Sequence, residues 1–210
     1  MKKNLLVLFL LLLTTGTYAQ VSVRGSMGIQ FISVPSLTDY LYQFPDDLPD
    51  FTSAVVFSAE GGYPVSDNTE LALELAYLYN SYNSTVNGGQ YTLSYDIIMP
   101  SVIYYYVIKG RGYSFKLGGG AGVRFALVEE KFPSFMAENY SSTGVGFLLK
   151  AEGNTSLGGN FYANIGGDIR YDLNGEPKNN GTAIQNKIAH ENVSMNAFSV
   201  GVHLGLTYQF

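Results

Sequence analysis

His190 and His203 are the two histidines of this 210-residue chain, which contains no cysteine. His190 is followed by Glu191, and Asn192 and Ser194 lie close by, a group that could serve a hydrolase. We recognise no hydrolase motif in this spacing, so we interpret His190 as a solvated loop residue. His203 alternates with apolar residues, and we expect a hydrogen-bonded core histidine there. The sequence therefore predicts no catalytic residue.

Two other patterns look like ligand sites but lack the spacing that such sites need. Asp46, Asp47 and Asp50 could hold a divalent cation, yet they do not have the ligand spacing of a calcium-binding loop. The run of three glycines at 118–120 is not followed by a helical pattern, so it is not a phosphate-binding loop. The lack of cysteine excludes disulfides and thiolate metal sites. We expect neither a metal nor a cofactor.

The residues around His203 alternate between apolar and polar side chains, as a strand with two unlike faces does. One face of this last segment carries Phe198, Val200, Val202, Leu204, Leu206, Tyr208 and Phe210. The same alternation recurs in seven earlier segments. We expect strands at 21–34, 54–63, 69–82, 91–108, 113–128, 142–156, 161–172 and 197–210.

The first residues are typical of an export signal. Lys2 and Lys3 precede an unbroken apolar run at 5–13, and small residues near Ala19 form a cleavage site. We expect residues 1–19 to be removed and the mature domain to span 20–210. The apolar run is shorter than the ~20 residues of a membrane-spanning helix. No other stretch is long and apolar enough, so a membrane role would fall to the strands.

The connections between the expected strands alternate in length. Residues 64–68, 109–112 and 157–160 are short turns, whereas 35–53, 83–90, 129–141 and 173–194 are longer polar loops. An even number of strands with short turns at one end and long loops at the other is typical of an outer-membrane barrel. The predicted fold is all-β: an eight-stranded antiparallel transmembrane up-and-down β-barrel with both termini on the periplasmic side.

A soluble barrel of the lipocalin type would also alternate, but with its charged face outward. Here the apolar face of each strand is too bulky to fill the narrow lumen of an eight-stranded barrel. If that face meets lipid instead, aromatic residues should gather at the two interfaces. We expect a periplasmic belt at Tyr63, Tyr113, Phe115, Phe161, Tyr208 and Phe210, and an outer belt at Phe31, Tyr77, Tyr79, Tyr91, Phe125, Tyr171 and Phe198.

Strand parity predicts which charged side chains face the lumen. The ten expected there are Arg24, Glu60, Glu74, Asp96, Lys116, Arg124, Lys150, Glu152, Asp168 and Arg170. Five are cationic and five are anionic, and we expect them to pair across strands, because an unpaired buried charge is costly. Residues 96–100 are apolar on both faces and contain Pro100, which cannot donate to a ladder, so we expect a bulge or register change there.

With these strands, loops and the terminal Tyr-Gln-Phe in view, the chain resembles the OmpA/OmpX-like small outer-membrane β-barrel domain family. The resemblance implies location in the bacterial outer membrane, contact with lipid and lipopolysaccharide, and use of the barrel-assembly machinery, which would read Tyr208 and Phe210 as a signal. Larger relatives continue into a peptidoglycan-binding domain. The sequence ends at Phe210, so we expect no such domain here.

Charge also limits the classes of partner. Without Lys2 and Lys3 the chain has 10 basic and 17 acidic residues, a net charge of −7, so we expect no nucleic-acid binding. Acidic residues gather in the long loops, together with Tyr40, Tyr42, Phe44, Phe51, Phe132, Phe135 and Met136. These apolar side chains would either contact a partner or pack together over the barrel mouth.

The expected function is that of a non-enzymatic surface protein, structural or adhesive through four long extracellular loops, with a lumen plugged by paired charges. An extracellular protein partner fits this expectation. One alternative is a narrow, porin-like pore for small or hydrophobic solutes. A second is a lipid-modifying barrel enzyme, because such barrels use a histidine with serine or acidic partners near the membrane edge.

Overall fold

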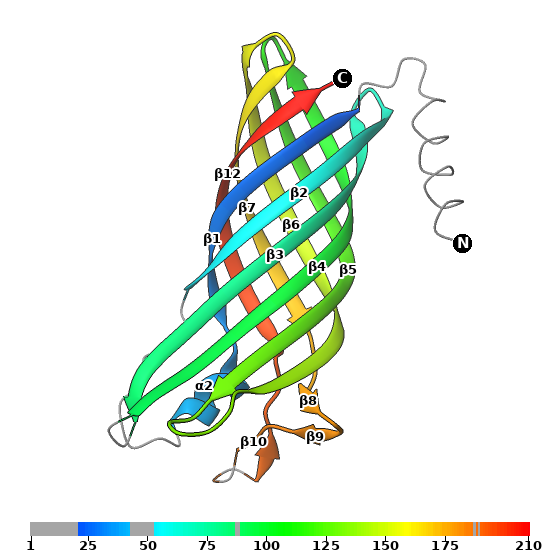
Figure 1. Ribbon diagram of the computed structural model, residues 1–210. Helices are drawn as coiled ribbons and strands as arrows, with labels where there is room; N and C mark the ends of the chain where they lie inside the picture. Colours follow the sequence, from blue (N-terminus) through cyan, green and yellow to red (C-terminus); the bar gives the residue numbers. More distant parts are fainter. Residues whose placement is uncertain (1–20, 43–52, 87–88, 187, 189) are drawn as a thin grey trace, which may run out of the picture.

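The computed structural model describes residues 21–42, 53–86, 89–186, 188 and 190–210. Eight long strands wind around a single barrel (Figure 1). They are β1 (Ser22–Ser33), β2 (Ser53–Ser66), β3 (Thr69–Val86), β4 (Gly89–Gly110), β5 (Tyr113–Lys131), β6 (Glu138–Gly158), β7 (Phe161–Leu173) and β12 (Ala197–Gln209). The expected signal peptide, with its cleavage site, lies outside the described residues.

Each long strand pairs antiparallel with the next one along the chain, and β12 pairs with β1 to close the barrel. The closing register sets Ile29 opposite Val202, and Ile29 lies opposite Val55 on its other side. Closure leaves no free sheet edge along the wall, so the backbone groups within the barrel are paired. The predicted fold class is confirmed.

Short turns join the strands at the end that holds the C-terminus, with two residues between β2 and β3 and two between β4 and β5. Gly112 adopts a φ of 78° and Gly159 a φ of 56°, left-handed conformations that glycine reaches without strain. The three short turns predicted from the sequence are therefore present. Figure 1 shows them at the top of the view, opposite the end that carries the helix.

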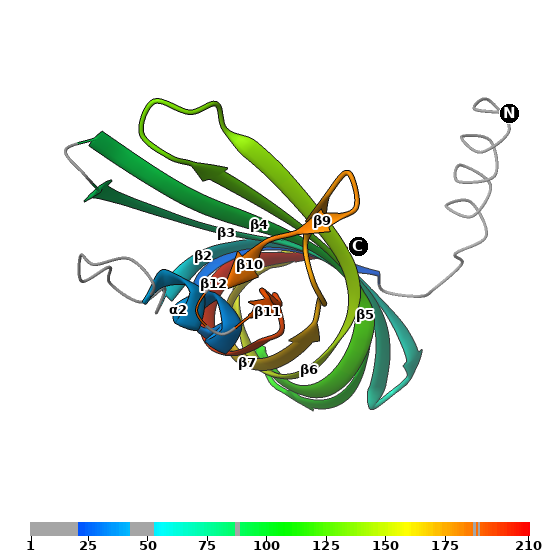
Figure 2. The same cartoon turned by 90° about the horizontal axis from the view of Figure 1, so that it is seen from below.

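The opposite end carries the smaller elements. Helix α2 (Pro35–Leu41) begins with proline in its first turn, where the missing N–H costs nothing. Four two-residue strands follow β7, namely β8 (Lys178–Asn179), β9 (Thr182–Ala183), β10 (Gln185–Asn186) and β11 (Glu191–Asn192). Figure 2 looks at this end and shows α2, β10 and β11 over the barrel opening. No helix in the described part of the chain is long and apolar enough to cross a bilayer.

The prediction of a loop at residues 83–90 is wrong for the residues that the structure describes there. Strand β3 continues to Val86 and β4 begins at Gly89, which lies opposite Val86, so strand pairing takes in residues 83–86 and 89–90. The third expected loop, 129–141, is likewise reduced to residues 132–137, because Glu130 still pairs with Glu138. Polar sequence predicted a loop in both places, but strand pairing continues beyond the apolar band.

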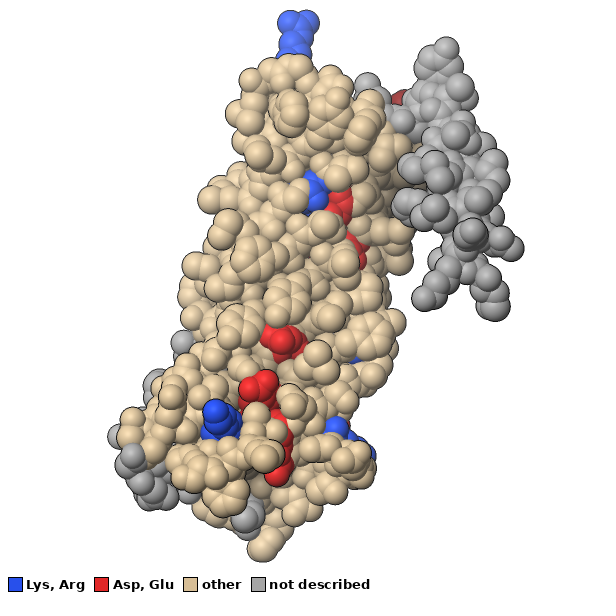
Figure 3. All heavy atoms as spheres, in the orientation of Figure 1, with Lys and Arg blue, Asp and Glu red and all other residues tan. Residues whose placement is uncertain are grey.

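The outward faces of the long strands are apolar. Val202 is 60% exposed and Leu73 is 66% exposed, and most other large exposed apolar residues alternate along the strands in the same way. In the view of Figure 3, charged residues are sparse on the wall between the two ends. An apolar outer surface of this kind is stable only against lipid. The predicted sense of the alternation therefore agrees with the exposure of these residues.

The expected outer belt contains one error. Tyr91 is buried in the interior, because β4 directs Tyr91, Leu93 and Tyr95 inward. The other expected belt residues are exposed on the wall or, for Tyr208, half-buried. At the periplasmic end the Tyr208 ring lies 5.0 Å from that of Phe161 and 4.7 Å from that of Phe210.

The same parity of β4 corrects the position of Asp96. Ile97 and Met99 are buried inside, so Asp96 lies on the outer face, on the same side of the wall as Tyr77 and Tyr79. Alternation fails here because both faces of this stretch are apolar. The expected bulge is also absent: the register between β4 and β5 is the same before and after Pro100.

Candidate functional site

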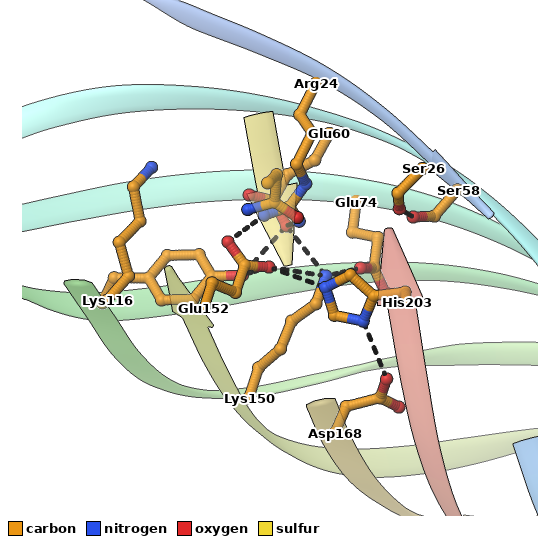
Figure 4. A network of polar contacts seen from close by, with 12 residues as sticks. Arg24, Ser26, Ser58, Glu60, Glu74, Lys116, Lys150, Glu152, Asp168 and His203 are labelled. Atoms are coloured by element: carbon orange, nitrogen blue, oxygen red, sulfur yellow. Dashed lines mark hydrogen bonds and ion pairs between the residues drawn. The ribbon is translucent and has the colours of Figure 1, made fainter. Parts of the chain in front are cut away.

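The barrel interior holds a network of charged side chains from strands that are far apart in the sheet (Figure 4). The guanidinium of Arg24 on β1 contacts Glu60 on β2, with Nη2 2.5 Å from Oε2, and also contacts Glu152 on β6. Lys150 Nζ lies 3.2 Å from Glu60 Oε2 and 3.3 Å from Glu152 Oε1, and it contacts Glu74. These side chains are almost fully buried.

Arg170 continues the network toward β12. Its Nη2 lies 2.9 Å from Glu74 Oε1, and its Nε lies 2.6 Å from Asp168 Oδ2. The Gln30 amide donates a further hydrogen bond of 2.6 Å to Asp168. His203 lies between two carboxylates, with Nε2 3.6 Å from Glu152 and Nδ1 3.5 Å from Asp168. The histidine therefore lies in the interior, where it contacts carboxylates of the network.

Tyr105 separates this network from the periplasmic end. Its hydroxyl donates to Glu60 Oε2 at 2.9 Å, and its ring lies under Lys116, whose Nζ is 5.6 Å from the ring centroid. Lys116 in turn pairs with Glu70 at 2.5 Å. Below them a cavity of about 700 Å³ opens between the short turns, with Glu70 and Lys116 in its lining.

The structure places nine of the ten expected lumen charges in the interior, each in an ion pair, and Asp96 is the exception. Two further interior carboxylates were missed. Glu70 pairs with Lys116, and Asp172 pairs with Arg124 at 2.5 Å. Both could have been found, since Glu70 has the parity of Glu74 and Asp172 that of Arg170.

Beyond the network, toward α2, the interior is apolar. Leu37 and Leu41 of the helix, Ile97 and Met99 of β4 and Met195 before β12 belong to one buried cluster that fills this half of the barrel. The cluster lies between the charges and the outer opening. Two kinds of packing, ionic and then apolar, thus follow each other along the barrel axis.

Some residues expected in exposed loops are buried at the mouth. Tyr40 of α2 and Tyr91 of β4 each donate a 2.7 Å hydrogen bond to Glu130 Oε1. The ring of Phe132 lies 5.1 Å from that of Tyr91. Burial raises the pKa of Glu130, although the two tyrosine hydrogen bonds lower it. The same burial, together with Glu130, raises the pKa of Tyr40.

The loop aromatics thus divide between the two expected roles. Tyr40 and Phe132 pack over the mouth, whereas Tyr42, Phe135 and Met136 are exposed. A cavity of about 420 Å³ opens between them, lined by α2, by the end of β5 with the β5–β6 loop, and by residues 182–185. We call it the mouth cavity. Phe44 and Phe51 lie outside the described residues.

His190, the other histidine of the chain, lies outside the network. His190 is exposed and adopts a φ of 55°. Within the described ranges, no group of three or more His, Asp or Glu side chains could hold a metal ion. Asp46, Asp47 and Asp50 fall outside those ranges.

Solved structures with the same architecture come from several bacteria. One is Ail, the attachment invasion locus protein of Yersinia pestis, in complex with the heparin analogue sucrose octasulfate, with 12% identity and a TM-score of 0.58. Another is a major outer membrane protein from Thermus thermophilus, with 13% identity and a TM-score of 0.55. A third is Neisserial surface protein A, with 14% identity and a TM-score of 0.52. Each match covers 92% of this chain and 100% of the other.

The fold is that of a small outer-membrane barrel. With its apolar wall, the chain is a transmembrane protein of the bacterial outer membrane, as the resemblance to OmpA/OmpX-like barrels implied. No protein-family model matches the sequence, and no curated protein is significantly similar to it. At these identities the structural likeness concerns the fold alone.

Proposed function

We propose that this protein is a non-enzymatic surface protein, structural or adhesive, that acts through its extracellular hairpins and loops while its lumen stays closed. The observation that carries the proposal is the packing of the interior. Arg24 bridges Glu60 and Glu152 across the lumen, and the apolar cluster above them is continuous from Leu37 to Met99. A solute would have to break both layers to pass.

Breaking the ionic layer is expensive. Removing one partner of a buried ion pair leaves an uncompensated charge, at a cost of about 3–5 kcal/mol. Nothing in the described interior forms a triad of nucleophile, base and orienting acid, because His203 lies between two carboxylates that are both already bound to cations. The exposed mouth is then the part of the molecule that is free to interact.

The extracellular elements support a binding role because they hold one another in place. The backbone N–H of Ser194 donates to Ser36 Oγ at 2.9 Å, and the Asn186 amide donates to the carbonyl of Asp39 at 3.2 Å. These bonds tie the last loop to α2. A preorganised surface loses less entropy on binding than a flexible one. Ail, a structural neighbour, is named an attachment protein, which agrees with an adhesive role.

Two measurements test the proposal together. In planar bilayers the wild-type protein should give no stable single-channel conductance. Replacing residues 132–137 by a short Gly-Ser turn should leave the barrel folded, abolish attachment of protein-bearing cells to host matrix or to neighbouring envelope proteins, and leave permeability unchanged. Stable conductance would favour the narrow pore instead. A protein-dependent change in lipid A acylation, lost on His203→Ala or His190→Ala, would favour the enzyme.

Biogenesis and lipid contact are part of the same proposal. Tyr208 and Phe210 would be read by the barrel-assembly machinery, and the exposed wall would contact lipid and, in the outer leaflet, lipopolysaccharide. The stacked rings of Phe161, Tyr208 and Phe210 give this end a defined aromatic surface. Deleting Phe210 should lower the amount of folded protein in the outer membrane, whereas refolding from urea into detergent should be unaffected.

A further inference from the structure

The mouth cavity has an unusual charge balance for a surface pocket. Glu130 and Glu138, which lie opposite each other on β5 and β6, both line it. No Lys, Arg or His belongs to its lining, all of which lies in the described part of the chain. The volume of about 420 Å³ falls in the range of small-molecule sites, roughly 300–1,000 Å³.

Glu130 is buried at 4% exposure and is held by two tyrosine hydroxyls. Both tyrosine hydrogen bonds go to Oε1, from Tyr40 and from Tyr91, each at 2.7 Å. Glu130 and Glu138 bring two carboxylates to one cavity without a basic residue among the described residues that line it. A buried carboxylate is costly when ionised, and a cation in the cavity would lower that cost. The second carboxylate, Glu138, accepts a hydrogen bond from Tyr140 and remains exposed at the rim.

Two apolar residues of the lining are exposed to solvent. Phe135 is 72% exposed and Met136 is 91% exposed, both on the β5–β6 loop. Ser134 precedes them with a φ of 66°, in a turn closed by a 3.2 Å bond from the Phe135 N–H to the Phe132 carbonyl. A non-glycine residue in this conformation is strained, and such strain is typically kept where it positions a functional group. Aromatic faces and methionine suit an apolar body that carries positive charge.

We propose that the mouth cavity binds an organic cation, an ammonium or guanidinium group on an apolar body. The charge lies against Glu130 and Glu138, and the apolar body lies against Phe135 and Met136. The cation comes either from a free amine or from a basic side chain of a partner protein. The inference rests on the proposed function, because it names the chemistry that the exposed mouth recognises. A metal ion is a poorer fit, since the cavity offers two carboxylates rather than a full set of ligands.

The test uses the full mature protein in nanodiscs of zwitterionic lipid and measures binding by NMR titration of the β5–β6 loop. Benzyltrimethylammonium should bind saturably. Benzyl alcohol, which lacks the charge, and phenylacetate, which reverses it, should not. Glu138→Gln and Glu130→Gln should each weaken the ammonium by about tenfold, the loss expected for one charge-assisted contact.

Glu129→Gln is the matched control. Glu129 precedes Glu130 on the same strand but faces outward and is not part of the cavity lining, so this variant removes the same charge without touching the site. It should bind as the wild type does. If Glu130→Gln fails to fold, the Glu138→Gln variant tests the inference by itself, because Glu138 is exposed and its replacement should not affect folding. Equal binding of phenylacetate, or wild-type affinity in Glu138→Gln, would overturn the inference.

A second arm distinguishes the two sources of the cation. Tighter binding of a short arginine-containing peptide than of benzyltrimethylammonium supports a partner's side chain, and the reverse order supports a free amine. The inference fails separately from the proposed function. If no cation binds while the 132–137 replacement still abolishes attachment, only the inference is wrong. If cations bind but the barrel conducts, the closed-lumen function is wrong.

Discussion

Arg24 on β1 and Glu152 on β6 form an ion pair across the barrel, although β12 and β7 lie between their strands in the sheet. The pair therefore spans the lumen rather than the wall. Both side chains are buried, at 4% and 0% exposure. Among its partners, Glu60 lies on β2, Tyr105 on β4, and Lys150 on β6 beside Glu152, so the network holds opposite sides of the barrel together.

The first prediction concerns this network. Glu152→Gln should lower the free energy of unfolding by about 1.5–3 kcal/mol, because Arg24 and Lys150 each lose a charged contact while Glu60 and Glu74 still neutralise them. Glu176→Gln is the control, since Glu176 forms an exposed pair with Lys178 at 3.9 Å, worth at most about 1 kcal/mol. Urea unfolding in lipid vesicles measures both. Equal effects of the two variants would contradict a structural role for the network.

The second prediction concerns the lipid face. Val202→Arg, near the middle of β12, should cost about 2–4 kcal/mol in a bilayer, because the charge enters hydrocarbon. Val202→Leu should be nearly neutral. Folding yield into vesicles and urea midpoints give the comparison. A Val202→Arg protein that inserts as readily as wild type would mean that β12 faces the other way.

The third prediction uses two glycines. A Cβ at Gly146 would lie 2.1 Å from Asp172 Oδ1 and 2.3 Å from Arg124 Nε, so Gly146→Ala should displace this ion pair. We expect a loss of about 1–3 kcal/mol, typical of overpacking. Gly25→Ala meets nothing within 4 Å and should change stability little. The two variants can be compared by thermal unfolding, with the gel mobility of the folded barrel as the readout. Similar unfolding midpoints for Gly146→Ala and Gly25→Ala would count against tight packing at Gly146.

The fourth prediction follows from the raised pKa of Glu130. The folded mouth favours the neutral carboxyl of Glu130, so the pKa of Glu130 is higher in the folded protein than in the unfolded chain. The contribution of Glu130 to the stability of the mouth is therefore greatest below the unfolded pKa, and it falls as the pH rises through the folded pKa. Hydrogen exchange of the α2 and β4 amides near Tyr40 and Tyr91 should therefore show more opening at neutral than at acidic pH. Correction for the intrinsic pH dependence of exchange is needed, and Glu129→Gln serves as the control.

Glu130→Gln should remove most of this pH dependence, since its amide oxygen can still accept the tyrosine hydrogen bonds but does not titrate. Glu138 and Tyr140 also face this region, and Glu138→Gln should leave the larger part of the effect in place. An organic cation should reverse the trend, because it stabilises the ionised form. An unchanged pH profile in Glu130→Gln would assign the effect to another group.

The sequence predicts the wall better than the interior, for a physical reason. Where one face meets lipid and the other is polar, as in β12, alternation specifies the facing of every residue from Phe198 to Leu206. In β4 the interior is itself apolar, so Ile97 and Ile98 look alike and the facing of Asp96 was wrong. Glu70 and Asp172 were missed, but both lie in strands with clear alternation, and their parity alone would have placed them in the interior.

The mouth was less predictable because it depends on contacts between segments far apart in the chain. Glu130 reads as a loop residue beside Glu129, yet it is buried by Tyr40, 90 residues away. Hydrogen bonds between α2 and the last loop are of the same kind. Such contacts leave no periodic pattern in the sequence. The mouth cavity could therefore be found only from the structure.

The β3–β4 hairpin extends beyond the strand next to it. Strand β2 pairs with β3 only up to Tyr79, whereas β3 continues to Val86, opposite Gly89 of β4. Seven more residues at about 3.3 Å each extend this hairpin by roughly 20 Å beyond its neighbour. The hairpin projects to one side of the opening that α2, β10 and β11 cover (Figure 2). In the proposed surface role, capture by the hairpin and chemical recognition at the mouth cavity would then take place at two separate points of the extracellular face.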